Sequence, residues 1–230
     1  MDEYDRLHAL VAATSGRAVR AWARDFLTEV FEGRRDLVAI RHPLGFLCFP
    51  AWRGGGRGVC IHVWTEGVRA DSTTSAMHAH SWDLLSIVLY GTVGNQILDV
   101  DDADDDTAFA PTHRLFEVHS GSEGDLVRAT PRAVGYRTRS TEHFRAGQVY
   151  TLRNGAFHRS DVRGEAATVV LGTDRVGTAD LSLGTFGTGD HRVRRTPCTR
   201  SETRGAARTV LTHLSERVSP NRLEDRCEWT

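Results

Sequence analysis

The spacing of hydrophobic residues changes along the chain from a helical period to a period of two, and then back again. Between residues 3 and 32, large apolar residues recur at helical spacing with arginines and acids between them. This pattern predicts a helix that packs one face against a larger body. A similar stripe predicts a last helix over about 200–218, where Thr199 and Glu202 form a capping box at its start.

Between about 36 and 174, apolar residues alternate with polar ones in short runs separated by Gly, Asp, Asn and Pro. The predicted strands are 59–64, 84–90, 95–100, 114–119, 125–129, 135–140, 148–152, 157–162 and 167–172. Many short strands at regular spacing are typical of an antiparallel sandwich or barrel. The stretch 175–197 is rich in Gly, Thr and Arg and is predicted to be irregular. We therefore expect an N-terminal helical extension (1–35), a β-barrel (36–175) and a C-terminal extension with one helix (176–230).

Two segments of the expected barrel carry histidines that could share one ion. The first is Met77-His-Ala-His-Ser-Trp-Asp83. In an extended segment His78 and His80 point to the same face, about 7 Å apart along the strand, and can converge on a metal. The second runs from Gly147 to His158. Asn154-Gly155 predicts a tight hairpin turn, and His158 then begins the returning strand, where it can face the first pair.

Together these segments resemble the two sequence motifs of the cupin superfamily. The first motif has H-x-H before a carboxylate, with a glycine after the next strand, as in His78, His80 and Gly91. The second has the spacing of Gly147, Gly155 and His158, with Arg153 where the family usually has proline. The resemblance covers about residues 45–175. It implies an all-β, cupin-type jelly-roll barrel with flanking helices, and a metal held by His78, His80 and His158. The alternative is three core or surface histidines that fall at these offsets by coincidence.

The sequence departs from the family at the fourth ligand. Many cupins supply a glutamate at the positions occupied here by Leu84 and Leu85, and the nearest carboxylate is Asp83, one residue early. On a regular strand Asp83 faces away from His80, so coordination by Asp83 would require a bulge. We expect a three-histidine site, with Asp83 either a fourth ligand or a structural hydrogen-bond acceptor.

Three neutral imidazoles leave the charge of a divalent ion uncompensated and leave several of its positions open. Iron(II) is the expected metal, because open adjacent positions suit the binding of a substrate together with O₂. Zinc accepts three histidines but has no redox chemistry. Nickel and manganese stay open as further alternatives.

Within the cupins, the chain resembles the thiol dioxygenases of the cysteine dioxygenase type. The resemblance rests on Val59–Gly67, on His78-Ala-His80 and on Leu84–Gly91. It implies an iron-dependent oxygenase whose partners are O₂ and a small amino-acid-like or thiol substrate. The crosslinking cysteine of the eukaryotic enzymes would lie near Leu85 and is absent here. Side chains expected to contact the substrate or line the pocket are Arg53, Arg57, His62, Tyr90 and Tyr150, with Arg41 in the same region.

The amino-acid composition excludes or disfavours several other kinds of function. All 29 basic residues are arginine, so an anionic substrate must be bound by Arg and a lysine Schiff base is excluded. The net charge of −1 and the lack of a basic tract favour neither nucleic acid nor a membrane surface. The four cysteines form no C-x-x-C pair, and the charged N-terminus lacks the apolar stretch of a signal peptide. A reducing cytoplasm is the expected compartment.

Two other functions remain open at this stage. One is a non-redox isomerase or lyase that uses the metal as a Lewis acid. The other is a non-catalytic small-molecule-binding cupin. By resemblance to cupins that dimerise through barrel edges, a homodimer is also expected.

Overall fold

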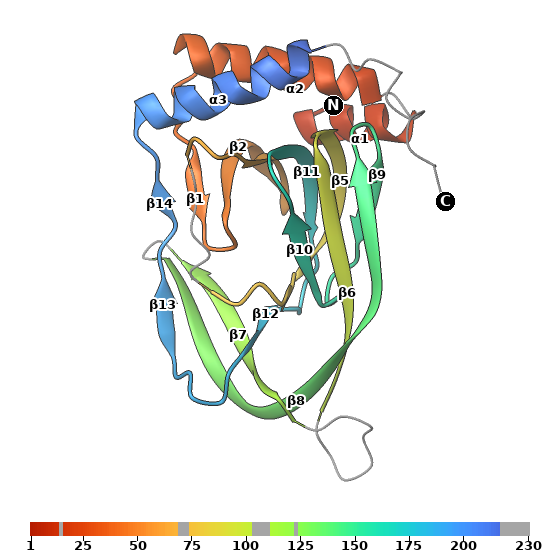
Figure 1. Ribbon diagram of the computed structural model, residues 1–230, viewed down its shortest axis with the longest axis vertical. Helices are drawn as coiled ribbons and strands as arrows, with labels where there is room; N and C mark the ends of the chain where they lie inside the picture. Colours follow the sequence, from red (N-terminus) through yellow and green to blue (C-terminus); the bar gives the residue numbers. More distant parts are fainter. Residues whose placement is uncertain (14–15, 69–73, 103–110, 122–123, 217–230) are drawn as a thin grey trace, which may run out of the picture.

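The computed structural model describes residues 1–230 except 14–15, 69–73, 103–110, 122–123 and 217–230. Two antiparallel sheets of seven strands face each other, and three helices lie together at one end (Figure 1). The predicted fold class, a cupin-type jelly-roll barrel with flanking helices, is therefore confirmed.

The first sheet carries the helices on its outer face. Its strands, in spatial order, are β14 (Thr196–Pro197), β1 (Ile40–His42), β2 (Phe46–Gly54), β3 (Arg57–Trp64), β11 (Ala166–Asp174), β5 (Trp82–Tyr90) and β9 (Val149–Leu152). Side chains alternate across a strand, so Ile61 and Val63 of β3 join the core beneath the helices. Cys60 and His62 of the same strand line the interior cavity.

The second sheet lies opposite the inner face of the first. Its strands, in spatial order, are β13 (His191–Val193), β8 (Gly124–Arg145), β6 (Thr92–Asp102), β10 (His158–Val162), β4 (His78–Ala79), β12 (Asp180–Gly184) and β7 (His113–Gly121). The first half of β8 pairs with β7 and its second half pairs with β6. These two pairings close the strands from β8 to β7 into a ring, and β13 pairs with β8 outside it.

Three helices cover the outer face of the first sheet: α1 (Glu3–Ala12), α2 (Gly16–Glu32) and α3 (Arg200–Ser215). The longest, α2, buries Trp22, Phe26 and Val30 against that sheet. Each large apolar side chain buried in this way contributes about 1.5–3 kcal/mol to stability. The helices therefore stabilise the first sheet from its outer side, and the inner face of that sheet can line a cavity.

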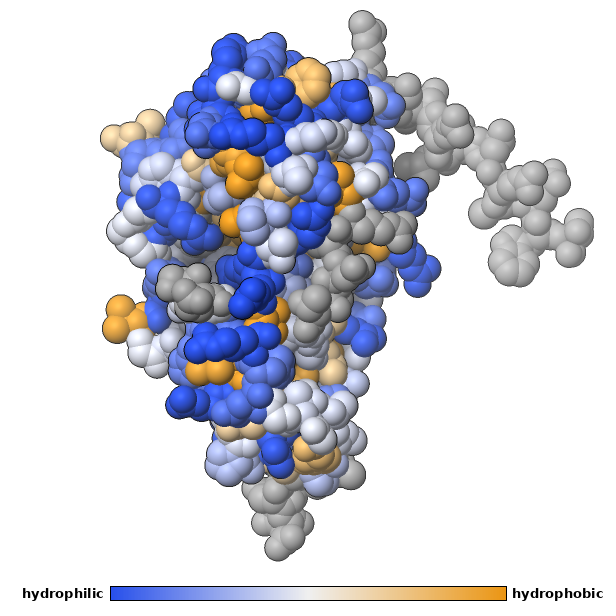
Figure 2. Space-filling view, turned by 90° about the vertical axis from the view of Figure 1, so that its left-hand side faces the viewer, coloured by the Kyte–Doolittle hydropathy of each residue, from blue (hydrophilic) through white to orange (hydrophobic). Residues whose placement is uncertain are grey.

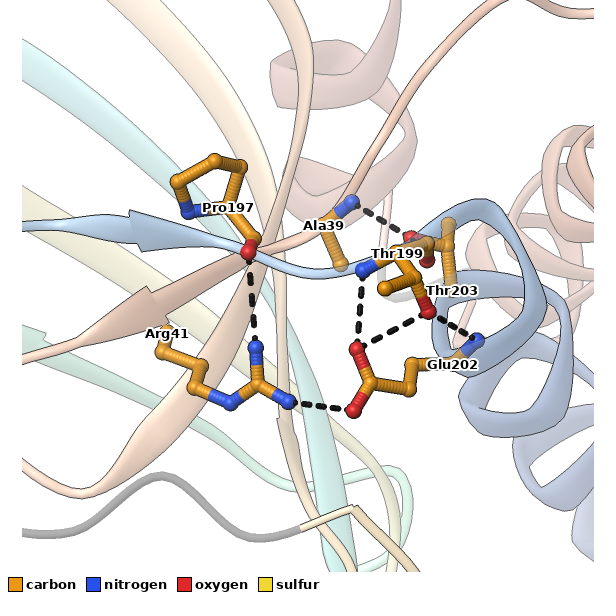
Figure 3. A network of polar contacts seen from close by, with 6 residues as sticks. All are labelled: Ala39, Arg41, Pro197, Thr199, Glu202 and Thr203. Carbon is orange, nitrogen blue, oxygen red and sulfur yellow. Dashed lines mark hydrogen bonds and ion pairs between the residues drawn. The ribbon is translucent and has the colours of Figure 1, made fainter.

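A polar network fixes the start of α3 against the first sheet (Figure 3). Glu202 and Thr199 form the predicted capping box, and the other oxygen of Glu202 accepts a 2.7 Å hydrogen bond from Arg41. The hydroxyl of Thr203 accepts the backbone N–H of Ala39 at 3.0 Å and donates to the carbonyl of Thr199. Arg41 is thus part of the helix anchor and lies in an ion pair with Glu202.

The surface seen from the side of β1, β13 and β14 is mostly hydrophilic, with small separate apolar groups (Figure 2). Large apolar side chains that are exposed, such as Phe31, Val176 and Phe186, come from different parts of the chain. Scattered apolar residues of this kind are normal on a folded protein. None of the described helices is both long enough and apolar enough to cross a membrane.

Several local predictions differ from the structure. The single helix expected over 3–32 is two helices, and the second begins at Gly16, a weaker helix former than alanine. The stretch 175–197 contributes β12, β13 and β14, which are too short and too polar to show a period. The runs 125–129 and 135–140 belong to one long strand, β8. The last helix ends at Ser215, and the end of its predicted span lies outside the described residues.

The turn at Asn154-Gly155 does not form a hairpin. Gly155 has a φ of +75°, as the predicted tight turn requires, but β9 pairs with β5 in the first sheet whereas β10 pairs with β6 and β4 in the second. The backbone N–H of Gly155 donates to the carbonyl of His80 at 2.8 Å. The turn therefore carries the chain from one sheet to the other and is tied to the H-x-H segment on the way.

Candidate metal centre

Strand pairing in the second sheet brings three histidines together. His78 opens the two-residue strand β4, His80 follows that strand directly, and His158 is the first residue of β10. His158 is the direct cross-strand partner of His78. The ring centroids are 4.3 Å apart for His78 and His158, 4.7 Å for His78 and His80, and 5.1 Å for His80 and His158. One ring nitrogen from each residue lies within 4.8 Å of the other two, close enough to share an ion.

Backbone hydrogen bonds orient two of these rings. Nδ1 of His78 lies 2.9 Å from the carbonyl oxygen of Ala76, and Nδ1 of His158 lies 3.0 Å from that of Ala156. A carbonyl only accepts, so each Nδ1 must carry the proton and each Nε2 is left with a free lone pair. Such a bond fixes both the tautomer and the ring direction of a metal-binding histidine.

Burial keeps the three rings neutral. It lowers the pKa of His78 to about 3, with a further contribution from His80, and lowers the pKa of His158 to about 3, with a further contribution from His78. The pKa of His80 is also held well below the usual value, first by burial and then by His158. Neutral imidazole is the form that binds a metal, so at neutral pH the site needs to lose no proton to accept one. The donor set fits a divalent transition metal.

His80 is positioned by a tryptophan and a glycine. Its ring stacks on Trp82 with centroids 4.2 Å apart and planes at 25°. On the neighbouring strand, a Cβ atom added at Gly172 would lie 2.9 Å from the Trp82 ring, closer than a real contact allows. The absence of a side chain at Gly172 therefore leaves room for Trp82, which in turn supports His80.

Asp83 is committed to a structural role outside the cluster. Its Oδ1 accepts the backbone N–H of Asn154 at 2.9 Å, and its Oδ2 binds the guanidinium of Arg175. These contacts lower the pKa of the Asp83 carboxyl, first through the Asn154 hydrogen bond and then through Arg175. Of the two roles expected for Asp83, the structure shows the hydrogen-bonding one, at the turn that leads to His158.

The cluster opens into a cavity of about 700 Å³ between the two sheets. Among the residues that line it are the predicted pocket residues Arg53, His62 and Tyr150. The His62 ring stacks on Phe46 with centroids 4.3 Å apart. Burial raises the pKa of Tyr150, so its phenol stays protonated.

Two predicted pocket residues serve other purposes. Arg57 reaches the rim of the cavity, but its guanidinium is bound by Asp2 and Asp5 at 2.6 Å each, so it fastens α1 to β3. Tyr90 lies outside the cavity because β5 has a bulge there: Ala167 opposes Tyr90, but Thr168 opposes Val88. The bulge turns Tyr90 toward the helices, where its ring stacks on His213 at 4.2 Å. The expectation that Tyr90 reaches the pocket is therefore wrong.

Sequence reasoning missed other polar residues of the cavity. His42 lines the cavity and stacks against Phe46, with centroids 4.3 Å apart, and burial lowers its pKa well below the usual value. Arg195 forms a 2.9 Å ion pair with the buried Asp125. Asp125 opens the predicted strand 125–129 and Arg195 lies in the stretch predicted to be irregular, but neither belongs to a motif that points to the cavity. His42 stands outside the predicted strands, in an H-P dipeptide that carries no metal motif.

The two sheets and the histidine cluster define a cupin-type barrel with a three-histidine metal-binding site. No family model and no curated protein matches the chain.

Solved structures similar to this chain include hydroquinone 1,2-dioxygenase from Sphingomonas sp. TTNP3, with 15% identity over 53% of this chain and 62% of that one and a TM-score of 0.33. A cupin superfamily protein from Desulfitobacterium hafniense has 8% identity over 56% and 78%, with a TM-score of 0.31. L-ribose isomerase from Cellulomonas parahominis has 12% identity over 56% and 61%, with a TM-score of 0.32. The chain thus spans about 62% of the length of the hydroquinone dioxygenase chain it resembles.

Proposed function

We propose that this protein is an iron(II)-dependent oxygenase acting on a small amino-acid-like or thiol substrate. The observation that supports this most is the convergence of His78, His80 and His158 inside a cavity of about 700 Å³. Iron(II) held by three neutral imidazoles keeps open positions at which a substrate and O₂ can be brought together.

Groups around the cluster would hold the three histidines and the substrate in position. The Nδ1–H groups of His78 and His158 are held by backbone carbonyls, so both Nε2 atoms point away from those bonds as preorganised donors. Trp82 packs against His80 and helps to exclude water from that side of the cluster. The phenol of Tyr150, kept protonated by burial, can donate a hydrogen bond to a polar group of the substrate.

Arg53 is the best placed residue for binding a substrate carboxylate. It lines the cavity, and among the described residues it forms no ion pair with an acid. Arg57 and Arg195, the other cavity arginines, are already paired with Asp2, Asp5 and Asp125. A guanidinium holds a carboxylate through two parallel hydrogen bonds, which would orient an amino acid toward the histidines.

The test combines metal analysis with oxygen consumption. Freshly purified protein is expected to contain iron in proportion to chain and to consume O₂ only when a small thiol or amino acid, such as cysteine, is added. Arg53→Gln is expected to raise KM for a substrate that carries a carboxylate much more than it lowers kcat. Zinc occupancy with no O₂ uptake across a broad panel of thiols and amino acids would contradict the proposal. Turnover that persists under nitrogen would instead select the isomerase or lyase alternative.

A further inference from the structure

A second group of three donor side chains lies in the same cavity, apart from the histidine cluster. It consists of Cys48 on β2 and of Cys60 and His62 on β3. One donor atom from each residue lies within 4.8 Å of the other two. Both cysteines are free thiols, and they are 8% and 9% exposed. Neither cysteine takes part in the proposed oxygenase chemistry.

The strand register explains why these three side chains meet. Cys48 is the direct partner of His62, whereas Cys60 is opposite Pro50. Cys60 and His62 are two residues apart on one strand and so share the cavity-facing side. Cys48 and His62 are therefore direct cross-strand partners, Cys60 and His62 are neighbours along one face of β3, and Cys48 and Cys60 are diagonal neighbours across the two strands.

The diagonal arrangement of the two thiols favours a shared ion over a disulfide. Diagonal neighbours in an antiparallel pair have Cα atoms about 7–8 Å apart. Two cysteines more than about 7 Å apart at Cα cannot be joined by an S–S bond unless the backbone moves. An ion placed between the donors bridges the remaining distance, because each sulfur then needs to reach only about 2.3 Å to the metal.

The surroundings of the cluster suit bound thiolates. Nη2 of Arg53 lies 3.9 Å from Sγ of Cys60 and donates to it. Hydrogen bonds to ligand sulfurs are a usual feature of protein metal sites. The Phe46 ring stacks on His62 and restricts its rotation, which holds the imidazole beside the thiols. The hydrogen bond between the two thiols holds the pKa of Cys60 well below its usual range and raises the pKa of Cys48 well above it, so without an ion Cys60 is the thiolate and Cys48 the donor.

We infer that Cys48, Cys60 and His62 form a second metal site, which binds one thiophilic divalent ion of the zinc class. Both thiols lose their protons to solvent on binding, so two protons are released for each ion and the two thiolates balance its charge. The thiolates select zinc-like ions over magnesium, calcium or manganese, which prefer oxygen ligands. All three residues line the cavity, so a fourth ligand could come from water or from a bound small molecule. This inference does not depend on the oxygenase activity.

Cobalt(II) provides a test, because a thiolate bound to cobalt absorbs strongly in the near ultraviolet whereas imidazole ligands do not. Reduced, metal-free protein is titrated with cobalt(II) under anaerobic conditions. The wild-type chain is expected to bind two ions and to develop the sulfur band. Cys48→Ser and Cys60→Ser are each expected to lose the band and to bind one ion. His158→Ala is expected to keep the band, which separates this site from the histidine cluster.

Cys198→Ser is the matched control, because Cys198 is a buried thiol in the core beneath the helices and belongs to neither cluster. It is expected to keep both ions and the full band. If the cysteine variants fail to fold, zinc-edge X-ray absorption of the wild-type protein loaded with two equivalents answers the same question, since sulfur bound to zinc is then expected. A wild-type protein that binds cobalt without a sulfur band, or zinc with only nitrogen and oxygen ligands, would overturn the inference. So would a wild-type chain in which Cys48 and Cys60 form a disulfide that reductant must break before any ion binds.

Discussion

His78 and His158 are direct cross-strand partners, and their ring centroids lie 4.3 Å apart although the two residues come from different halves of the chain. The pairing of β4 with β10 therefore creates the metal site. His158→Ala should reduce metal affinity by more than the roughly 10- to 100-fold typical for loss of an outer hydrogen-bond partner. His119→Ala changes an exposed histidine of β7 that pairs with Glu117, and should leave metal content unchanged. Equal metal content in both variants after dialysis would contradict the assignment.

Gly172 should control the metal site without touching it. In Gly172→Ala, the added methyl group would push on the Trp82 ring and, through it, on His80. We expect metal affinity to fall about tenfold, as when the support of a ligand is disturbed. Gly187→Ala, where no heavy atom lies within 4 Å of the added Cβ, serves as the control. Competition with a chromophoric chelator measures both affinities, and identical values would argue against this support.

Asp83→Asn should preserve the metal and weaken the fold. The substitution removes the charge that binds Arg175 and weakens the acceptor for the N–H of Asn154. We expect full metal stoichiometry and a loss of about 1 kcal/mol in the free energy of unfolding, because the contacts are partly exposed to solvent. Urea unfolding together with metal analysis checks both statements. A variant of unchanged stability that has lost its metal would contradict this purely structural role of Asp83.

The metal-free protein should lose stability as the pH falls below that of an unperturbed histidine. His78 and His158 have folded-state pKa values of about 3, below the ordinary value near 6.5. Between these limits the unfolded chain binds protons that the folded chain cannot. The free energy of unfolding should therefore decrease with falling pH by up to about 1.4 kcal/mol per pH unit for each ring. Urea titrations at several pH values measure the slope, and His158→Gln should make it shallower. An unchanged slope would mean that the ring titrates normally.

Thr203→Val should destabilise the contact between α3 and the sheet. The variant keeps the shape of the side chain but leaves the buried N–H of Ala39 without its acceptor. An unsatisfied buried donor costs about 1–3 kcal/mol. Thr212→Val on the exposed side of α3 should change stability by less than about 0.5 kcal/mol. Thermal unfolding of the two variants, compared side by side, checks the difference.

The main strands and the histidine triad could be read from the sequence for different reasons. The strands of the barrel core have one buried face, so their apolar residues alternate along the chain, as in β3. The histidines could be assigned only because two motifs with family-like spacing occur together. Neither β4, with two residues, nor the partnership of His78 with His158 leaves a pattern of its own.

What could not be predicted depends on register and local irregularity. Cys48 meets Cys60 and His62 only because β2 and β3 pair in one particular register, which the sequence does not reveal. In a regular strand the side chain of Tyr90 would face inward, but a single bulge turns it outward. Asn154-Gly155 does form a tight turn, but local turn chemistry cannot show that the flanking strands belong to different sheets.

The brevity of β4 has a consequence for the order in which the protein folds. A two-residue strand cannot persist alone, and both its neighbours, β10 and β12, come from much later in the chain. Ring closure over such long stretches is slow and follows the assembly of nearer contacts. We therefore expect the histidine triad to be completed after the nearer contacts of the barrel wall, so that all three ligands are available to an ion only late in folding.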